Sequence, residues 1–271
     1  MPTLSALLNR LTTRAVMAVV DARVPRTGYR VERGLAYGPE RRHCLDVYVP
    51  DRPQGPVLVF FYGGSWQSGS RSLYRAVGEA FANEGIVTVV ADYGLYPEVK
   101  YPTFIEDGAL AARVVRDHAT TWGGDPKRLF LAGHSAGAYI AVMLGVNPVY
   151  LAAQGLAPSD LAGIVGIAGP YDILPLYDPV LIDIFGGARN MATQPIKHAS
   201  PAAPPMLLVH GTADKTVGAG NSRRLAARLG RVELIEYAGV GHAGILLSLA
   251  HGRRHRTSLH ADMLRFLRSR S

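Results

Sequence analysis

The sequence is poor in cysteine, with Cys44 as the single one among 271 residues. A lone cysteine cannot form an internal disulfide framework, and it leaves no cysteine-based zinc site. The chain also lacks any apolar run as long as the ~18 residues that a membrane span needs. These absences exclude a small disulfide-stapled scaffold and a cysteine zinc module, and we expect no stable membrane insertion.

Charged residues make up only 18% of the chain, whereas apolar residues make up 48%. Such a composition supports a large buried core and argues against disorder, and the length suits one large α/β domain. The formal net charge is +8, with the arginines scattered until a basic stretch at residues 251–256. Because no aromatic residues alternate with these bases, we expect no nucleic-acid partner, only weak attraction for anions or membranes.

The N-terminal residues show a helical pattern, with leucines at positions 4, 7, 8 and 11. A signal peptide would carry its charge before an uninterrupted apolar stretch, and here Arg10 and Arg14 interrupt it. We therefore expect residues 1–30 to form an amphipathic helix that packs on the body, on a partner subunit or over the active site. A surface anchor in a membrane is the alternative. The expected location is cytoplasmic, and a homodimer is an assembly that such a segment allows.

Apolar strands alternate with amphipathic helices along the rest of the chain. This order predicts the α/β class, with a mostly parallel, doubly wound sheet covered by helices on both faces, in one domain over residues 31–271. A cap-like insert at about residues 169–205 follows the end of an apolar strand, at the edge where open α/β sheets bind ligands. Strands are expected near 45–49, 57–61, 86–91, 128–131, 164–168, 206–210 and 232–237, and helices near 73–83, 103–120, 222–229 and 258–267.

A Gly-His-Ser-Ala-Gly sequence at residues 133–137 follows one of these strands and precedes a run of small residues. A serine nucleophile projects from a strained strand-to-helix turn, where glycines on both sides avoid clashes. The following helix directs its free N–H groups towards the space beside the serine oxygen. We therefore predict that Ser135 is a nucleophile. The alternative is an ordinary glycine-softened turn with an exposed serine.

A serine hydroxyl needs a base to take its proton and an acid to orient that base. Asp214 and His242 each lie just past a predicted strand, in the chain order Ser, Asp, His that is typical of this architecture. Asp172 is the alternative acid. His134 is expected to point away from the serine oxygen, and His210 to lie inside a strand end. No spacing of ligands indicates a metal site and no glycine loop cradles a phosphate, so neither a metal nor a cofactor is expected.

The loop at residues 61–66 follows another apolar strand and carries two adjacent glycines. Its backbone N–H groups can turn inward to hold an oxyanion, together with the residue after the nucleophile. We assign these donors to Gly64, Ser65 and Ala136. An ordinary glycine turn is the alternative reading of this loop.

The motifs together resemble those of the α/β-hydrolase superfamily, near the hormone-sensitive-lipase-like carboxylesterases and the kynurenine formamidase-like esterases. The resemblance runs from about residue 45 to residue 267. It implies the α/β-hydrolase fold and a serine carboxylesterase that forms an acyl-enzyme on a small ester. The matching segments are Leu-Asp-Val-Tyr at 45–48, Tyr-Gly-Gly-Ser-Trp at 62–66, Asp-Tyr-Gly-Leu-Tyr-Pro at 92–97, Gly-Gly-Asp-Pro at 123–126, residues 133–137, His-Gly-Thr-Ala-Asp at 210–214 and Gly-His at 241–242.

Two positions depart from the family's pattern. Tyr62 stands where the oxyanion motif opens with histidine, and Gly94 stands where arginine is common after Asp-Tyr. Tyr62 therefore changes how the loop is shaped. The change at Gly94 means that Asp92 needs another partner or lies in a looser loop.

The substrate remains open between an ester and, with the same triad, a formamide or amide. A non-catalytic binding module is an alternative of another class. We expect the pocket to be lined by Trp66, Tyr171, Leu174 and Phe185. Because the insert is too short for an extended lid, we expect short to medium acyl esters and not long-chain triglycerides.

Overall fold

The computed structural model describes residues 24–25 and 27–269. The helix expected within residues 1–30 therefore lies almost wholly outside the described residues, and Tyr29 and Arg30 already belong to the first strand, β1 (Tyr29–Ala36). Strand β1 was not predicted from the sequence. Its charged residues break the apolar pattern, and it pairs on one side only, as an edge strand antiparallel to β2 (Cys44–Pro50).

Eight strands form one sheet in the order β1-β2-β4-β3-β5-β6-β7-β8. The first two pairings are antiparallel and the rest are parallel, as the sequence predicted for most of the sheet. The remaining strands are β3 (Gly55–Phe61), β4 (Val87–Ala91), β5 (Gly124–His134), β6 (Gly163–Ile167), β7 (Met206–Gly211) and β8 (Val232–Tyr237).

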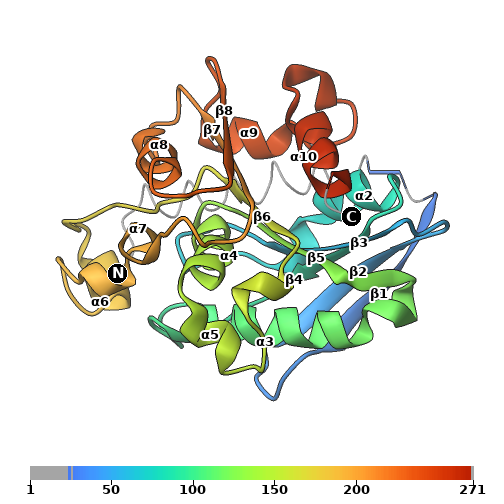
Figure 1. Ribbon diagram of the computed structural model, residues 1–271, viewed down its shortest axis with the longest axis horizontal. Coiled ribbons are helices and arrows are strands. Elements are labelled where there is room, and N and C mark those ends of the chain that lie inside the picture. The colour runs from blue at the N-terminus through green and yellow to red at the C-terminus, as the bar shows by residue number, and fades with distance from the viewer. Residues whose placement is uncertain (1–23, 26, 270–271) are drawn as a thin grey trace.

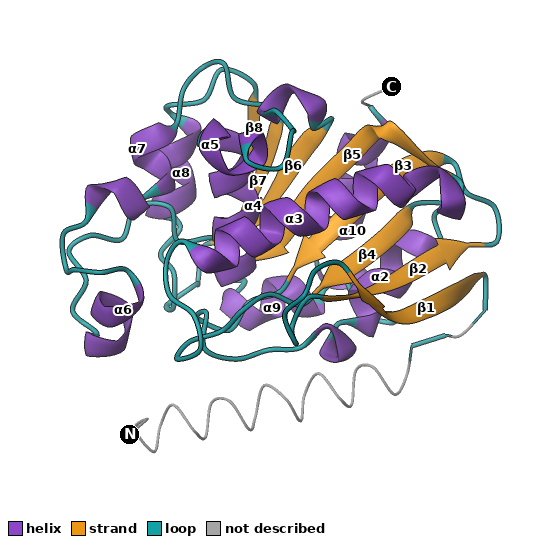
Figure 2. Ribbon diagram, turned by 90° about the horizontal axis from the view of Figure 1, so that it is seen from below, coloured by secondary structure: helices purple, strands orange, loops and turns teal. Residues whose placement is uncertain are grey.

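Helices cover both faces of the sheet (Figures 1 and 2). The helices α3 (Thr103–His118) and α4 (Ala136–Val146) lie on one face, and α2 (Arg75–Ala82) and α10 (Leu259–Arg268) lie on the other. The shorter helices are α5 (Pro148–Ala152), α6 (Pro179–Ile184), α7 (Pro195–His198), α8 (Gly220–Ala226) and α9 (His242–Leu247). This arrangement is the α/β-hydrolase fold that the sequence predicted.

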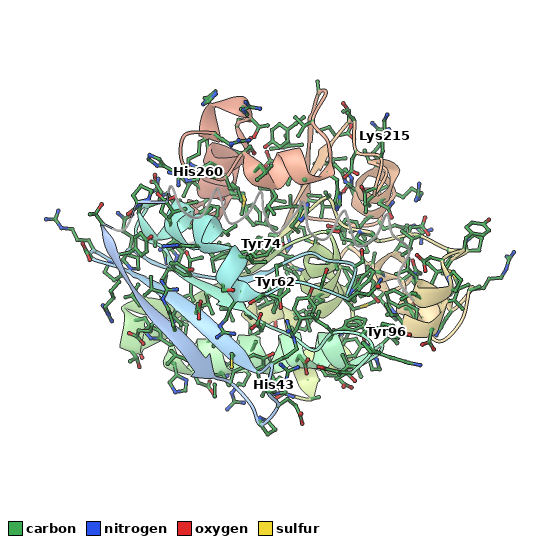
Figure 3. The ribbon with its side chains drawn as sticks, turned by 180° about the vertical axis from the view of Figure 1, so that it is seen from behind. His43, Tyr62, Tyr74, Tyr96, Lys215 and His260 are labelled. Carbon is green, nitrogen blue, oxygen red and sulfur yellow. The ribbon has the colours of Figure 1, made fainter. Side chains whose placement is uncertain are left out.

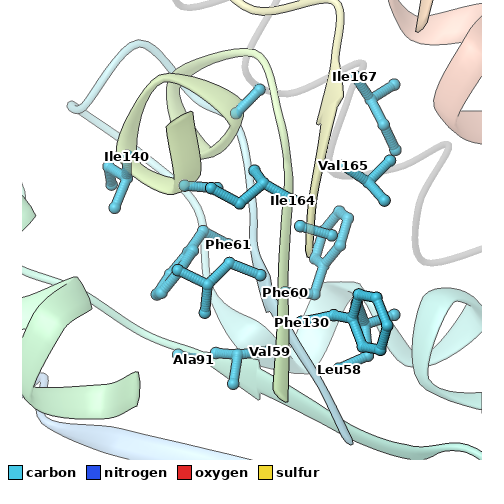
Figure 4. Packing of buried hydrophobic residues seen from close by; sticks show 14 of the residues in the cluster. Leu58, Val59, Phe60, Phe61, Ala91, Phe130, Ile140, Ile164, Val165 and Ile167 are labelled. Atoms are coloured by element: carbon cyan, nitrogen blue, oxygen red, sulfur yellow. The ribbon is translucent and has the colours of Figure 1, made fainter. Parts of the chain in front are cut away.

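The core lies where the central strands meet α4. Strands β3 and β5 carry continuous apolar runs because both of their faces are covered. Every residue of α4 is buried, which matches a helix that is apolar all round. Figure 4 shows Phe60, Phe61 and Phe130 packed with aliphatic side chains of this region. The packed core therefore ends next to the residues at which the candidate site begins.

The insert between β6 and β7 carries α6 and α7, and α6 lies at the periphery of the molecule, on the side away from β1 (Figures 1 and 2). Asp178 begins α6 by accepting hydrogen bonds from the N–H groups of Val180 and Leu181. Pro179 follows at the first helical position, where its missing N–H costs nothing. The insert is thus a partly helical cap, as its length indicated.

Candidate active site

Ser135 lies at the sharp turn between β5 and α4. Its backbone has φ 54° and ψ −120°, a conformation that costs a non-glycine residue about 1–3 kcal/mol. A methyl group at Gly133 would come 2.3 Å from the backbone of Gly137, and one at Gly137 would come 2.0 Å from the Phe61 carbonyl oxygen. Only glycine fits either position, so the structure supports the turn that the sequence predicted around Ser135.

Asp214 and His242 meet at the same edge of the sheet. Asp214 follows β7, and His242 is the first residue of α9. The Nδ1 atom of His242 donates to Oδ2 of Asp214 over 2.6 Å. Because the Nδ1–H group donates a hydrogen bond to the carboxylate, Nε2 is the basic atom of the imidazole.

Backbone groups hold the other oxygen of the Asp214 carboxylate. Its Oδ1 accepts from the N–H groups of Thr216 and Val217, at 2.8 and 2.9 Å. Burial raises the pKa of Asp214, but the bonds from Val217, His242 and Thr216 outweigh burial and leave the pKa below its ordinary value. The carboxylate is therefore ionised and able to stabilise an imidazolium.

Asp172, the alternative acid, has a different partner. Its Oδ2 accepts from Nε of Arg224 over 2.5 Å, and its carbonyl oxygen accepts from the same guanidinium over 2.9 Å. The structure thus brings His242 to Asp214 and leaves Asp172 in an ion pair on the surface. Within the described residues Ser135 Oγ makes no hydrogen bond to His242. Such bonds are often long until a substrate is bound.

Two histidines, His134 and His210, flank the acid and the base, and neither had a role predicted from the sequence. His134 Nε2 donates to the carbonyl oxygen of His242 over 3.0 Å. His210 donates through Nε2 to the Val217 carbonyl and accepts at Nδ1 from the Ser222 hydroxyl, both over 2.8 Å. Burial lowers the pKa of both rings, to about 3 for His134. The sequence did carry a signal for both histidines. Each is a polar ring at the end of an apolar strand, and such a ring needs hydrogen-bond partners when it is buried.

The predicted oxyanion loop lies directly against Ser135. A methyl group at Gly63 would come 3.0 Å from Ser135 Cβ. Three successive residues have positive φ, with 136° at Gly64, 53° at Ser65 and 58° at Trp66. A methyl group at Gly64 would come 2.0 Å from a carbonyl oxygen, so this position requires glycine. The loop is a strained turn and not an ordinary one.

The three assigned donors are available to a ligand. Among the described residues, the N–H groups of Gly64, Ser65 and Ala136 donate to no protein oxygen. Ala136 is the first residue of α4, where an N–H has no partner inside the helix. The structure thus leaves the assigned donors free on the segments that border Ser135, the geometry an oxyanion hole needs.

Tyr62 opens this loop and is held by charged groups. Its hydroxyl donates to Asp92 Oδ1 over 2.7 Å and accepts from Arg42 Nη2 over 2.6 Å. Its ring stacks on those of Tyr74 and Tyr93, with centroids 5.3 and 4.8 Å apart. Figure 3 shows Tyr62 and Tyr74 together in the interior. The tyrosine therefore fixes the start of the loop through its ring and its hydroxyl.

Asp92 has other partners in place of the arginine that is common at position 94. The Arg71 guanidinium pairs with it, the Arg71 N–H donates to Oδ1 over 2.8 Å, and Arg42 lies 3.6 Å away. The segment is not loose, since a methyl group at Gly94 would come 2.7 Å from Val99. Two arginines from other parts of the chain replace the missing one.

The four residues predicted to line a pocket lie in different surroundings. Trp66 and Phe185 are buried and pack edge to face with centroids 4.8 Å apart, and Trp66 also contacts Tyr139 at 5.2 Å. Leu174 is partly buried beside the core. Tyr171 is fully buried over β6, where a methyl group at Gly166 would come 2.1 Å from its hydroxyl. It packs into the core there, and the lining of one pocket by all four residues stays a prediction.

The strained serine turn, the acid–base pair and the glycine loop all lie at the ends of parallel strands of an α/β-hydrolase fold. The BD-FAE family model matches residues 45–229, which is more than half of the sequence. The chain belongs to the BD-FAE family.

Relatives and solved structures with this fold are named as esterases. Esterase LipC of Mycobacterium tuberculosis is 29% identical over 265 residues, covering 87% of this chain and 64% of LipC. A probable isoprenylcysteine alpha-carbonyl methylesterase of Arabidopsis thaliana, ICMEL1, is 28% identical over 246 residues, covering 80% of this chain and 52% of the relative. The chain thus spans about half the length of the plant relatives that it matches.

The structural comparisons give the same fold. Esterase 2 of Thermogutta terrifontis, solved with butyrate bound, is 27% identical with a TM-score of 0.70, covering 90% of this chain and 94% of that one. The Pyrobaculum calidifontis esterase, at 21% identity and a TM-score of 0.77, covers 99% of this chain and 94% of its own. At that identity the second likeness shows the fold alone.

Proposed function

We propose that the protein is a serine carboxylesterase with Ser135 as nucleophile, His242 as base and Asp214 as the acid that orients the base. The observation that carries the proposal is the 2.6 Å bond from His242 Nδ1 to Asp214, formed at the edge of the sheet that also carries the strained turns at Ser135 and at residues 64–66. The esterase names of the relatives support the same activity.

The reaction follows from the geometry. Ser135 Oγ attacks the ester carbonyl and passes its proton to His242 Nε2, while Asp214 stabilises the imidazolium. The negative charge that develops on the carbonyl oxygen is held by the N–H groups of Gly64, Ser65 and Ala136. His242 then protonates the leaving alkoxide, and an acyl-enzyme remains. Water attacks this acyl group by the same steps in reverse and frees Ser135.

A fluorophosphonate probe tests the nucleophile, because it labels an activated serine and ignores an inert one. We expect wild-type protein to be labelled and Ser135→Ala to be neither labelled nor active, with a melting temperature near that of wild type. His242→Ala should lose about as much activity, since triad members act as a unit. Retention of a tenth of the wild-type kcat in Ser135→Ala would overturn the assignment.

For the substrate we infer an ester with a short to medium acyl chain. Trp66, the last residue of the predicted oxyanion loop, is buried and packed against Phe185 of the insert, and we expect these two rings to limit the room for an acyl chain. Esterase 2 of Thermogutta terrifontis is solved with butyrate and with propionate bound, which supports acids of this size. Each methylene adds at most ~0.8 kcal/mol while the protein can bury it, and nothing afterwards.

A panel of p-nitrophenyl esters measures this limit. We expect kcat/KM to peak between acetate and about hexanoate and to fall by decanoate. A profile still rising at palmitate, with activation at an emulsion surface, would indicate a lipase instead. N-formylkynurenine belongs in the same panel, because faster turnover of it than of any ester would favour the formamidase alternative.

Location and assembly are further proposals. No helix in the described part of the chain is long and apolar enough to cross a bilayer. We propose a cytoplasmic protein that retains residues 1–25, with a homodimer as the assembly to test. Intact-mass measurement of expressed protein checks retention, and sedimentation checks the dimer. Recovery of a shortened, exported form would contradict the location.

A further inference from the structure

His134 is a buried titratable group in contact with the catalytic base, and the proposed reaction does not use it. It is the last residue of β5 and the neighbour of Ser135. Its ring centroid lies 4.7 Å from that of His242, and its Nε2 lies 3.0 Å from the His242 carbonyl oxygen. On its other side, a methyl group at Gly63 would come 3.0 Å from its Nδ1. One side chain therefore contacts the base and the oxyanion loop.

The segment that carries the base needs such a contact. His242 follows Gly239 and Gly241, and neither glycine has close neighbours, since a methyl group at Gly239 would meet nothing within 4 Å. No side chain caps α9, and the residues from 238 to 244 are exposed or only half buried. Backbone bonds such as Ala213 N–H to the Val240 carbonyl, at 3.1 Å, hold the loop before His242. The His242 ring is held by its bond to Asp214, and its carbonyl is held by His134.

His134, by contrast, lies on a rigid support. It pairs with Ile167 in the parallel register of β5 and β6, and the N–H of Ser135 donates to the Ile167 carbonyl over 2.9 Å. A bond from His134 to His242 therefore ties the base to a residue that is one peptide away from the nucleophile. The position of His242 relative to Ser135 then depends on His134 together with Asp214, and less on the exposed loop.

We propose that His134 is a positioning residue, which holds the His242 backbone through its Nε2–H so that the imidazole reaches Ser135. The inference rests on the proposed esterase function. Burial keeps the His134 ring neutral, with a pKa lowered to about 3, so it does not repel the imidazolium that forms on His242 during the reaction. Misplacement of a catalytic group by about 1 Å can cost about 10²-fold in rate, which sets the size of the effect.

Two amide substitutions separate the hydrogen bond from simple packing. In His134→Gln the amide nitrogen can take the place of Nε2, whereas in His134→Asn it can reach only the place of Nδ1. We expect the glutamine variant to keep kcat within about 3-fold of wild type, and the asparagine variant to lose between about 10-fold and about 100-fold. KM should stay close to wild type in both, and His134→Leu should resemble the asparagine variant. Fluorophosphonate labelling rates should follow kcat.

Equal kcat in the glutamine, asparagine and leucine variants would overturn the proposal, whether all three are active or all three are impaired. A measurement on wild-type protein decides the matter if a variant does not fold. Nitrogen-15 NMR of the histidine side chains should show His134 neutral and protonated on Nε2 between pH 5 and 8. A ring protonated on Nδ1 alone would exclude the bond to His242. If wild-type protein neither labels nor hydrolyses esters, the proposed function fails, and this spectrum still tests the bond.

Discussion

Ser135 is bordered on one side by the segments that carry Asp214 and His242, and on the other by the oxyanion loop. The protein holds these two sides in different ways. The loop with Asp214 and the segment with His242 are fixed by neutral histidines, His134 and His210, and by backbone N–H groups. The oxyanion loop is fixed through Tyr62 by a cluster of ions whose carboxylates are buried and whose guanidiniums are partly exposed. These ions are two nearly inaccessible carboxylates, on Asp46 and Asp92, and the two guanidiniums of Arg42 and Arg71.

This difference determines which substitutions each side of the site can accept. Neutral donors can be replaced by other donors of the same reach, because no charge is left behind. A buried ion cluster has balanced charges, and removal of one partner leaves the others uncompensated. We therefore expect substitutions on the acid–base side to change the rate, and substitutions among the ions to change stability first.

The largest expected effect is on the rate, at Asp214. Asp214→Asn should lower kcat by about 10⁴-fold, because an amide favours the wrong tautomer of His242. Asp172→Asn is the matched control, since that carboxylate pairs with Arg224 on the surface, and its kcat should stay within about 3-fold. Steady-state kinetics on a short p-nitrophenyl ester measures both. A larger loss of kcat in the Asp172 variant would show that Asp172, which follows β6, is the acid.

Asp92 tests the other side. Asp92→Asn keeps the shape but leaves Arg71 and Arg42 short of a charge, and we expect a loss of about 3–5 kcal/mol in the free energy of unfolding. Urea denaturation measures the loss. Asp183→Asn removes an exposed pair with Lys100 and should change stability far less. If the two variants are equally stable, the ion cluster does not support the fold as argued.

The free energy of unfolding should depend on pH through His134. His134 has a pKa of about 3 in the folded protein and 6.5 as its ordinary value. As pH falls below 6.5 the unfolded chain binds a proton that the folded chain does not, so stability is lost between pH 6.5 and pH 3. From pH 7 to pH 5 this one ring accounts for about 2 kcal/mol.

The His134→Gln variant isolates that contribution. Its free energy of unfolding should fall by about 2 kcal/mol less than that of wild type between pH 7 and pH 5. The other buried histidines, such as His210 and His260, are present in both proteins and cancel. Identical pH dependence of the two proteins would show that His134 is protonated in the fold and would contradict its neutral state.

The same division separates what the sequence predicted from what it did not. Ser135, Asp214 and His242 could be placed because each follows a strand, and parallel strands end at one edge. The positions of Gly133 and Gly137 could be explained from local sterics alone. Roles that arise within a few residues of a strand end are visible in the pattern.

Roles that depend on distant partners were not visible. His134 meets His242 across 108 positions, and Arg42 meets the Tyr93 carbonyl across 51. β1 was missed because a charged edge strand gains its pairing from β2 and not from an apolar run. The need for a new partner at Asp92 was predicted from Gly94, but which arginines supply it is set by tertiary packing.

The Tyr62 hydroxyl links the oxyanion loop to the ion cluster, and we expect the mildest change from its removal. Tyr62→Phe keeps the stacked ring but removes the bond to Asp92 and the acceptor for Arg42. A hydrogen bond of this kind contributes about 1 kcal/mol, so we expect kcat to fall by about 3-fold to 10-fold through looser positioning of Gly64 and Ser65, with KM unchanged. Tyr37→Phe is the control, since its hydroxyl donates to the Asp92 carbonyl and does not contact the loop. That variant should lose stability of similar size and keep its kcat. If both variants lower kcat equally, the ions affect the site through the fold as a whole, and Tyr62 has no special part in holding the oxyanion loop.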